Sequence, residues 1–455
     1  MTADLLIYNA RLVATVDADR RELPGGWVAI TNGLISGVGA STDVLPEASE
    51  RIDASGCLVT PGLINTHHHL YQNLTRAYPP MTSSPLFGWL QTLYPLWRAL
   101  DEESAHVSAW IGLAELALSG CTTSTDHLYL HPRNGGDLLS AEIAAAKDLG
   151  IRFHPTRGSM SLSQKDGGLP PDDVVQEDDE ILALSQVAVE RHHDRSFGAM
   201  TRVALAPCSP FSVTKDLMIR SAELAEKLDV RLHTHFAENA EDDDFSIATF
   251  GCRPFEYLKE VGWLSNRTWV AHCVMPNPEE VKELGRAGVG VAHCPSSNLI
   301  LASGIAPIVD LRAHGVKVGL GVDGSASADS ASLWLEARQA MLLAKLRNGA
   351  DAGSARMALE CATVGGAGCL GREGEIGEIS EGAVGDLAIW SLTGPVFAGA
   401  VADPIEAWLR CGPTSARDTI VHGRTIVRNG MLVSGELESM LRQHDVLSRK
   451  IQRLS

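Results

Sequence analysis

The chain has 455 residues, of which 45% are apolar and 21% charged, so it can bury a large core and is neither disordered nor fibrous. Its net charge of −18 argues against nucleic acid and acidic membrane surfaces as partners, because both attract lysine and arginine. The nine cysteines are scattered, and neither a signal-like leader nor a membrane-length apolar stretch is visible. We therefore expect a cytoplasmic protein with free thiols.

Both ends of the chain are β-rich. Short apolar runs alternate with turn residues in the first 60 positions, where Asn32-Gly33 is a strong hairpin signal. The same texture returns after about residue 375, where Asn429-Gly430 predicts a second hairpin turn. We expect one small β-sandwich built from residues 1–60 and 376–455, with a polar helix closing the chain from about 436 to 452.

The middle of the chain, residues 61–375, alternates strand-length apolar runs with helix-like segments. Strands are expected within 61–69, 122–125, 152–155, 202–206, 231–235, 269–272, 289–293 and 318–322. Helices are expected at 104–119, 141–149, 179–191, 215–228 and 278–287. Strands followed repeatedly by helices imply parallel βαβ units, and eight such units imply an α/β fold of the (β/α)8 TIM-barrel type.

The histidine-rich stretch Pro61–His69 is the first candidate for chemistry. Side chains alternate along a strand, so His67 and His69 point one way and His68 the other. Two imidazoles from one strand end can share a metal ion. An isolated His-x-His is equally often a turn whose imidazole rings hydrogen-bond to the backbone. Other residues are needed to decide between such a turn and a metal site.

Four more polar residues follow the ends of later strands, namely His235, Glu238, His272 and Asp323. The carboxyl ends of barrel strands meet at one rim, so these side chains should converge with the histidine pair. Three imidazoles and a carboxylate suit Zn²⁺ or another borderline divalent ion, which lowers the pKa of bound water. Each residue alone could be structural, but the joint placement favours a metal site. The roles of other strand-end residues stay open, namely His233, His293 and Cys294.

This set of residues resembles the signature of the amidohydrolase superfamily, in particular its purine and triazine aminohydrolases. The likeness covers nearly the whole chain, including the split sandwich. It implies that one divalent ion, Zn²⁺ before Fe²⁺ or Mn²⁺, is held by His67, His69, His235 and Asp323.

The same resemblance implies the remaining catalytic roles. His272 would orient water or substrate, Asp323 would take the water proton, and Glu238 would move protons. Binuclear members carry a carboxylated lysine after strand 4, where this chain has no lysine between Ala206 and Pro210, so one metal is implied. Homo-oligomers are common in the family, and we expect one.

The loop after the first strand gives the best clues to the substrate. Gln72 lies three residues past His69, where guanine deaminases also have a glutamine, and its amide can read an N–H/C=O edge. Trp89 resembles the tryptophan that covers the ring in adenosylhomocysteine-type deaminases, or is a core residue of a lid. Arg157 could hold a ring oxygen, or pair with a surface carboxylate. Cys208 replaces a histidine of the adenosylhomocysteine-type enzymes, which weakens a nucleoside reading.

Within this branch the loop is most similar to bacterial enzymes that act on 8-oxoguanine. The expected partners are a small purine-like substrate and water, and the expected products are uric acid and ammonia, with His272 also touching the substrate. The alternatives are hydroxyatrazine-type triazine hydrolysis and deamination of guanine or isocytosine, which present the same edge. A non-catalytic scaffold is a remote alternative, because every expected ligand is present.

Overall fold

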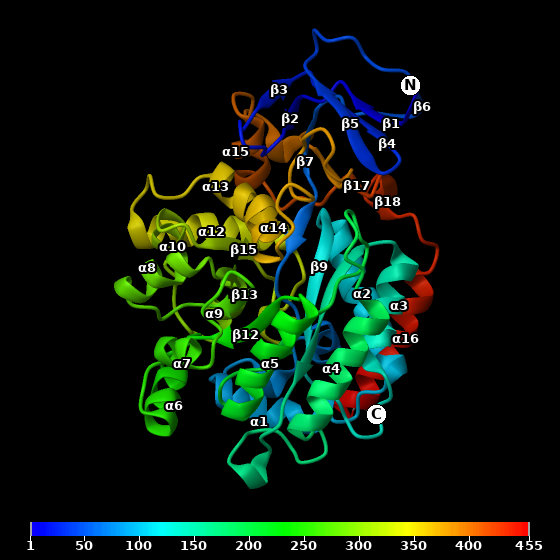
Figure 1. Ribbon diagram of the computed structural model, residues 1–455. Coiled ribbons are helices and arrows are strands. Elements are labelled where there is room, and N and C mark those ends of the chain that lie inside the picture. Colours follow the sequence, from blue (N-terminus) through cyan, green and yellow to red (C-terminus); the bar gives the residue numbers. More distant parts are fainter. Residues whose placement is uncertain (1, 454–455) are drawn as a thin grey trace.

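The computed structural model describes residues 2–453, and a closed barrel of eight parallel strands forms its centre (Figure 1). Its strands lie side by side in chain order. They are β8 (Leu63–Asn65), β9 (Cys121–Leu128), β10 (Arg152–Ser159), β11 (Ala204–Pro207), β12 (Leu232–Phe236), β13 (Thr268–His272), β14 (Gly290–His293) and β15 (Lys317–Leu320). The predicted (β/α)8 barrel is confirmed.

Helices connect the barrel strands, and local signals set their ends. The side chain of Asp101 accepts from the backbone N–H of Ser104 at 2.9 Å and caps α2, and α3 ends at Gly150 with φ 82°. The helices are α1 (Leu86–Trp97), α2 (Glu102–Leu118), α3 (Leu138–Leu149), α4 (Asp178–His192), α5 (Lys215–Leu228), α6 (Ala240–Phe250), α7 (Pro254–Glu260), α8 (Pro278–Ala287), α9 (Pro295–Ile300), α10 (Ile308–Ala313), α11 (Ser325–Ala328), α12 (Leu333–Asn348), α13 (Ala355–Glu360), α14 (Gly366–Cys369), α15 (Pro404–Arg410) and α16 (Leu437–Gln452). Within residues 2–453, no helix is long and apolar enough to cross a membrane.

The main core lies between the barrel and its helices. Leu205 of β11 and Val291 of β14 belong to the same apolar cluster as Leu217 of α5 and Leu284 of α8. Because strand side chains alternate, these outward residues leave their neighbours facing the barrel interior, where the polar group assembles.

Two further sheets come from the chain ends. One has the order β5-β4-β1-β6 and the other β19-β18-β17-β16-β7-β2-β3. Ile7 and Val28 of the first sheet pack with Val59 and Ile389 of the second in one apolar cluster, so the predicted sandwich is present. The strands are β1 (Ala3–Tyr8), β2 (Leu12–Ala14), β3 (Glu22–Pro24), β4 (Trp27–Thr31), β5 (Leu34–Gly39), β6 (Ala48–Asp53), β7 (Cys57–Pro61), β16 (Leu387–Ser391), β17 (Asp418–Val421), β18 (Arg424–Arg428) and β19 (Met431–Leu432).

Both predicted hairpin turns form. Asn32 and Gly33 have φ of 52° and 78°, and Asn429 and Gly430 have 51° and 76°, the left-handed pairs that a two-residue hairpin requires. We propose domain limits of 1–60, 61–375 and 376–455, because β7 ends in the sandwich just before β8 starts the barrel. The closing helix α16 packs along α2 (Figure 1). It also contacts the short helix η1 (Leu70–Thr75).

Candidate metal and catalytic site

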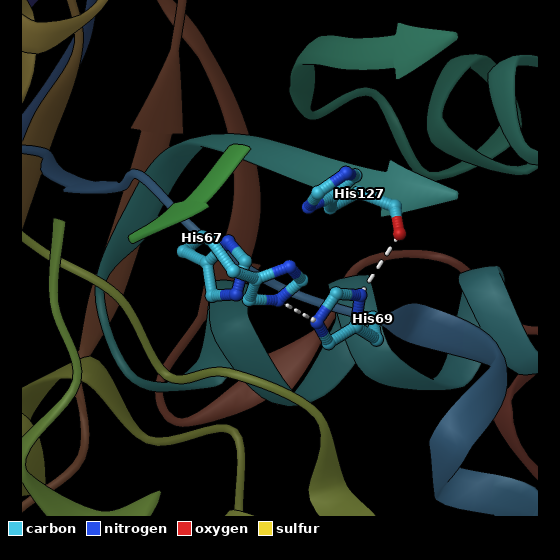
Figure 2. A group of neighbouring side chains, drawn as sticks. His67, His69 and His127 are labelled. Carbon is cyan, nitrogen blue, oxygen red and sulfur yellow. Dashed lines mark hydrogen bonds between the residues drawn. The ribbon is translucent and has the colours of Figure 1, made fainter. Parts of the chain in front are cut away.

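The two histidines of the first strand end face the barrel interior. His67 and His69 lie just beyond β8, are buried, and have ring centroids 4.7 Å apart (Figure 2). His68 points the other way, since a Cβ placed on Gly112 of α2 would lie 3.6 Å from its Nε2. The arrangement matches the predicted split between two inward rings and one outward ring.

Backbone hydrogen bonds fix the tautomers of His69 and His235. Nδ1 of His69 donates to the carbonyl oxygen of His127 at 2.8 Å (Figure 2), and Nδ1 of His235 donates to that of Cys208 at 2.6 Å. A neutral imidazole has one N–H, so each Nε2 carries a lone pair. These two Nε2 atoms face each other at 3.2 Å. Two lone pairs at this distance repel unless they share a cation.

His67 is oriented by a relay through His233. Nδ1 of His233 donates to the carbonyl oxygen of Trp269 at 2.9 Å, so its Nε2 accepts from Nδ1 of His67 at 2.8 Å. Nε2 of His67 therefore also carries a lone pair, and it has no hydrogen-bond partner among residues 2–453. The sequence does not define the role of His233. In the structure it orients His67, as the hydrogen-bond partners of metal-bound histidines do.

Asp323 completes the group from the segment after β15. Its Oδ1 lies 3.3 Å from Nε2 of both His67 and His69. Burial raises the pKa of the Asp323 carboxyl, but the imidazoles around it outweigh burial and hold this pKa well below its ordinary value. The φ of 59° at Asp323 is left-handed, a strained conformation that is common where a side chain must be aimed at a site.

The donor spacing fits one divalent ion. Donors that lie about 2.0–2.1 Å from a tetrahedral zinc ion are roughly 3.3–3.4 Å from one another. The distance between Nε2 of His69 and Nε2 of His235 is 3.2 Å, and Oδ1 of Asp323 lies 3.3 Å from Nε2 of both His67 and His69. Burial lowers the pKa of His67, His69 and His235, so the rings stay neutral and free to ligate. Three nitrogens and a carboxylate therefore fit the metal that the sequence predicts.

His127 belongs to this group but was missed in the sequence. One of its ring nitrogens lies within 4.8 Å of ligand atoms from the three inward histidines. Its Nε2 donates to the carbonyl oxygen of Ala206 at 3.1 Å, which leaves a lone pair on Nδ1. The inward parity of Thr123 and Thr125 extends to position 127, so a longer strand assignment would have found it.

Glu238 and His272 form a second pair beside the metal group. Nδ1 of His272 donates to Oδ1 of Asn298 at 3.0 Å, and its Nε2 lies 3.6 Å from Oε2 of Glu238 and 3.9 Å from Oδ2 of Asp323. Burial lowers the pKa of His272, but the two carboxylates outweigh burial and raise it overall. Burial raises the pKa of Glu238 to about 7. A carboxyl that titrates near neutrality can both hold and release a proton.

A cavity opens over these groups, and the space between its lining atoms, with the open solvent at its mouth counted, is about 410 Å³. Helix α1 covers it with a lid of apolar and aromatic side chains. The cavity is lined by His69, Gln72, Leu86, Trp89, Leu90, Tyr94, Tyr129, Cys208, Phe211, His235, Glu238, His272, Leu301, Asp323 and Ser327. The structure therefore gathers most of the predicted site residues around one space, with His67 buried beneath it.

Gln72 enters the cavity from η1. A Cβ on Gly324 would lie 1.8 Å from its Oε1, so the amide occupies room that only a glycine leaves beside Asp323. This Oε1 is buried without a hydrogen-bond partner among residues 2–453. An unpaired buried amide oxygen at a cavity wall is poised to accept from a ligand.

The structure does not bring Arg157 to the cavity. Arg157 shares a face of β10 with Phe153, which packs in the outer core, so strand alternation turns it outward. Its guanidinium donates to Oε1 of Gln176 at 2.6 Å and to the carbonyl oxygen of Gly158. The predicted contact with a ring oxygen has no geometric support, and His293 and Cys294 do not line the cavity either.

Comparison with known proteins identifies the family. The sequence pattern of the amidohydrolase family matches residues 58–426, and the chain belongs to this family. A relative from Pseudomonas aeruginosa named 8-oxoguanine deaminase is 46% identical, over 95% of this chain and 96% of the relative. The hydroxydechloroatrazine ethylaminohydrolase of Pseudomonas sp. (strain ADP) is 34% identical, over 99% of this chain and 96% of the relative.

A solved structure agrees with these relatives. The atrazine chlorohydrolase from Arthrobacter aurescens TC1 complexed with zinc has a TM-score of 0.93 and 34% identity, covering 98% of this chain and 100% of that one. The predicted family and enzyme class are confirmed: the protein is a hydrolase of the aminohydrolase type with a divalent-metal site.

Proposed function

We propose that this protein hydrolyses the exocyclic amine of 8-oxoguanine to give uric acid and ammonia, with one zinc ion in its site. The observation that carries the proposal is the buried amide of Gln72, whose oxygen at the cavity wall has no hydrogen-bond partner among the described residues. An amide can accept from an N–H and donate to a C=O, the pair of groups that an amino-pyrimidinone edge offers. The 46% identity to a protein named 8-oxoguanine deaminase supports the same substrate.

The cavity suits a flat free base. Its aromatic walls favour stacking, and its carboxylates are Glu238 and Asp323, both of which the chemistry uses, so none is left for ribose hydroxyls. Burial raises the pKa of the Cys208 thiol to about 12, so the thiol stays protonated and can donate to a substrate oxygen. Both features favour a base that carries ring oxygens over a nucleoside.

The residues that would hold the ion are His67, His69, His235 and Asp323. When bound, a divalent ion supplies the Lewis acidity that makes water a nucleophile near neutral pH. Zinc is the proposed metal because a similar structure contains it, and Fe²⁺ or Mn²⁺ would use the same ligands. One ion rather than two is proposed because no lysine ends β11.

The protein groups would then move protons around the attacked carbon. Asp323, with His272 beside it, accepts the proton of the attacking water. Glu238 delivers a proton to the adjacent ring nitrogen and then helps protonate the departing amine, which a pKa of about 7 allows. His272, fixed by Asn298, donates toward the oxygen of the tetrahedral adduct and stabilises its charge.

A substrate panel tests the proposal. The purified zinc-loaded enzyme is assayed for ammonia release from 8-oxoguanine, guanine, isocytosine, hydroxyatrazine and adenosine compounds. We expect the highest kcat/KM for 8-oxoguanine, with guanine and isocytosine slower. A higher kcat/KM for hydroxyatrazine would contradict the proposal and favour triazine hydrolysis. This is the second candidate because of the 34% identity to the ethylaminohydrolase. Absence of both metal and turnover would favour a scaffold protein.

We also propose a cytoplasmic homo-oligomer. All nine cysteines are unpaired, as a reducing compartment predicts. Light scattering coupled to gel filtration measures the assembly, and a strictly monomeric species at micromolar concentration would contradict the oligomeric part.

A further inference from the structure

A cluster of arginines closes the amino-terminal end of the barrel, opposite the catalytic rim. Arg152, at the start of β10, binds Asp386 through two hydrogen bonds of 3.1 Å. Arg202 lies 3.0 Å from Glu375, and Arg372 binds the same carboxylate. In this layer of charged residues at the end of the barrel, two carboxylates thus form ion pairs with three guanidinium groups.

A fourth cation lies at this end of the barrel and forms no ion pair with a carboxylate among residues 2–453. Arg231, just before β12, packs against Gly371: a Cβ on Gly371 would lie 2.7 Å from its Nη1. Its guanidinium also lies 6.0 Å from the centroid of the Trp269 ring. The nearby carboxylate of Glu373 is bound to Lys317 at 2.8 Å. Among the described residues, the layer therefore has a surplus of positive charge.

Several N–H groups of the cluster lack acceptors. Nε and Nη1 of Arg372, and Nε and Nη2 of Arg231, are buried with no hydrogen-bond partner within residues 2–453. Arg372 is 1% exposed, and its Nη2 is occupied by the carbonyl oxygen of Ala199 at 2.9 Å. Both ring nitrogens of His154 are likewise unpartnered, and this ring is 2% exposed. Burial and the surrounding arginines lower the pKa of His154, so the ring stays neutral. The His154 ring centroid lies 6.0 Å from that of Trp269, the same ring that the Arg231 guanidinium approaches.

Unpaired buried donors and surplus buried charge are both costly, and an acceptor that carries negative charge relieves both at once. We propose that a small inorganic anion, of the size and charge of chloride, binds between Arg231, Arg372 and His154 at the closed end of the barrel. We expect a small ion because Trp269 packs with Leu370 and Ile376, which follow α14, in one buried apolar cluster at this end. The site would stabilise the fold and take no part in catalysis.

Anomalous diffraction and thermal unfolding test the proposal on the metal-loaded enzyme. Crystals soaked in sodium bromide should give an anomalous peak within hydrogen-bond distance of Arg231 and Arg372. In solution, the Tm should rise by roughly 1–3 °C in sodium chloride over sodium methanesulfonate at equal ionic strength. Arg231→Met should abolish this difference, while Arg356→Met, which removes a surface cation bound to Glu22, should keep it.

The opposing outcomes are equally specific. Density for water without an anomalous peak, equal Tm values in the two salts, or a chloride effect that survives in Arg231→Met would each overturn the anion site. If Arg231→Met does not fold, the bromide peak and the salt comparison in the unchanged protein decide. Because neither readout involves turnover, the result is independent of the proposed deaminase activity.

Discussion

His444 in the last helix donates from Nε2 to Oδ1 of Asn73 at 2.8 Å. Nδ2 of Asn73 in turn donates to the carbonyl oxygen of Ser108 in α2 at 2.8 Å. About two turns further along α16, Nε2 of Gln452 donates to the carbonyl oxygen of Leu74 at 2.7 Å. The C-terminal helix therefore holds η1, the short helix that lines the substrate cavity.

Replacing His444 by alanine should raise KM roughly three- to tenfold with a smaller change in kcat, because η1 loses a half-buried hydrogen-bond partner while the catalytic group stays in place. Burial lowers the pKa of His444 to about 4, so the ring is neutral from pH 6 to 8 and the effect should not vary over this range. Gln443→Ala, at an exposed neighbour on the same helix, is the control. Equal KM values for the two variants would show that this contact does not position η1.

The barrel and most of the metal group could be predicted because both rest on local patterns. His67 and His69 share a face by alternation, and barrel closure brings polar strand ends to one rim. His127 was missed because β9 runs on past the predicted strand at 122–125, and Asp126, the next residue, is of a type that is rare in strands. Closure of the sheet, not propensity, keeps those later residues in the barrel.

The direction of Arg157 and the contact of His444 depend on distant parts of the chain, so local sequence patterns do not predict them. The predicted substrate contact of Arg157 rests on its residue type alone. The direction of its side chain depends on the register of β10 in the folded barrel. His444 and Asn73 are 371 positions apart, and no periodicity links residues over that distance. The histidine tautomers also depend on distant residues, since each is set by a carbonyl oxygen or a ring from another part of the barrel.

Loss of the metal should abolish turnover and reduce stability. Without a cation, the lone pairs of the converging histidines and the Asp323 carboxylate face one another at 3.2–3.3 Å, so the folded state loses binding energy. A chelator should remove activity and lower the Tm, and Zn²⁺ should restore both. His235→Asn should lower metal content below about a tenth of the normal value, whereas His106→Asn, a half-buried control on α2, should not. Full metal content in His235→Asn would remove that residue from the ligand set.

Glu238→Gln should keep the metal and lose about 10²- to 10⁴-fold in kcat, because the amide matches the carboxyl in shape but cannot carry a proton between water and substrate. Metal analysis and steady-state kinetics on the same sample separate the two effects. Glu241→Gln, three positions further along the chain in α6, serves as the matched control. A near-normal rate in Glu238→Gln would assign the proton transfer to another group.

Gly324→Ala tests the placement of Gln72 without altering Gln72 itself. The added methyl would lie 1.8 Å from Oε1, so the amide must swing away from its position at the cavity wall. We expect kcat/KM for 8-oxoguanine to fall roughly tenfold, as for Gln72→Ala, with the metal retained. If both changes act through the same amide, the double variant should be no worse than Gln72→Ala alone. Additive losses would mean that Gly324→Ala disturbs Asp323 instead.

Asp126 of β9 and Glu142 of α3 form a buried carboxyl pair behind η1. Oδ1 of Asp126 accepts from the backbone N–H of Leu70 at 2.6 Å, directly after His69. Burial raises the pKa of both carboxyl groups above their ordinary values, and for Glu142 the charge of Asp126 adds to the effect of burial. In the folded protein the pair therefore keeps protons that the unfolded chain releases above about pH 4.

A raised carboxyl pKa in the folded state makes unfolding easier as pH rises, because the unfolded state binds fewer protons over that range. Stability from this pair is thus complete below about pH 4 and is lost progressively towards neutral and alkaline pH. Glu142→Gln removes one titrating member, so its Tm should fall less between pH 5 and pH 8, by roughly 2–4 °C, than that of the unchanged protein. Glu103→Gln, at an exposed site on α2, should follow the unchanged protein. Parallel Tm curves for all three proteins would show that the pair does not contribute to the pH dependence of stability.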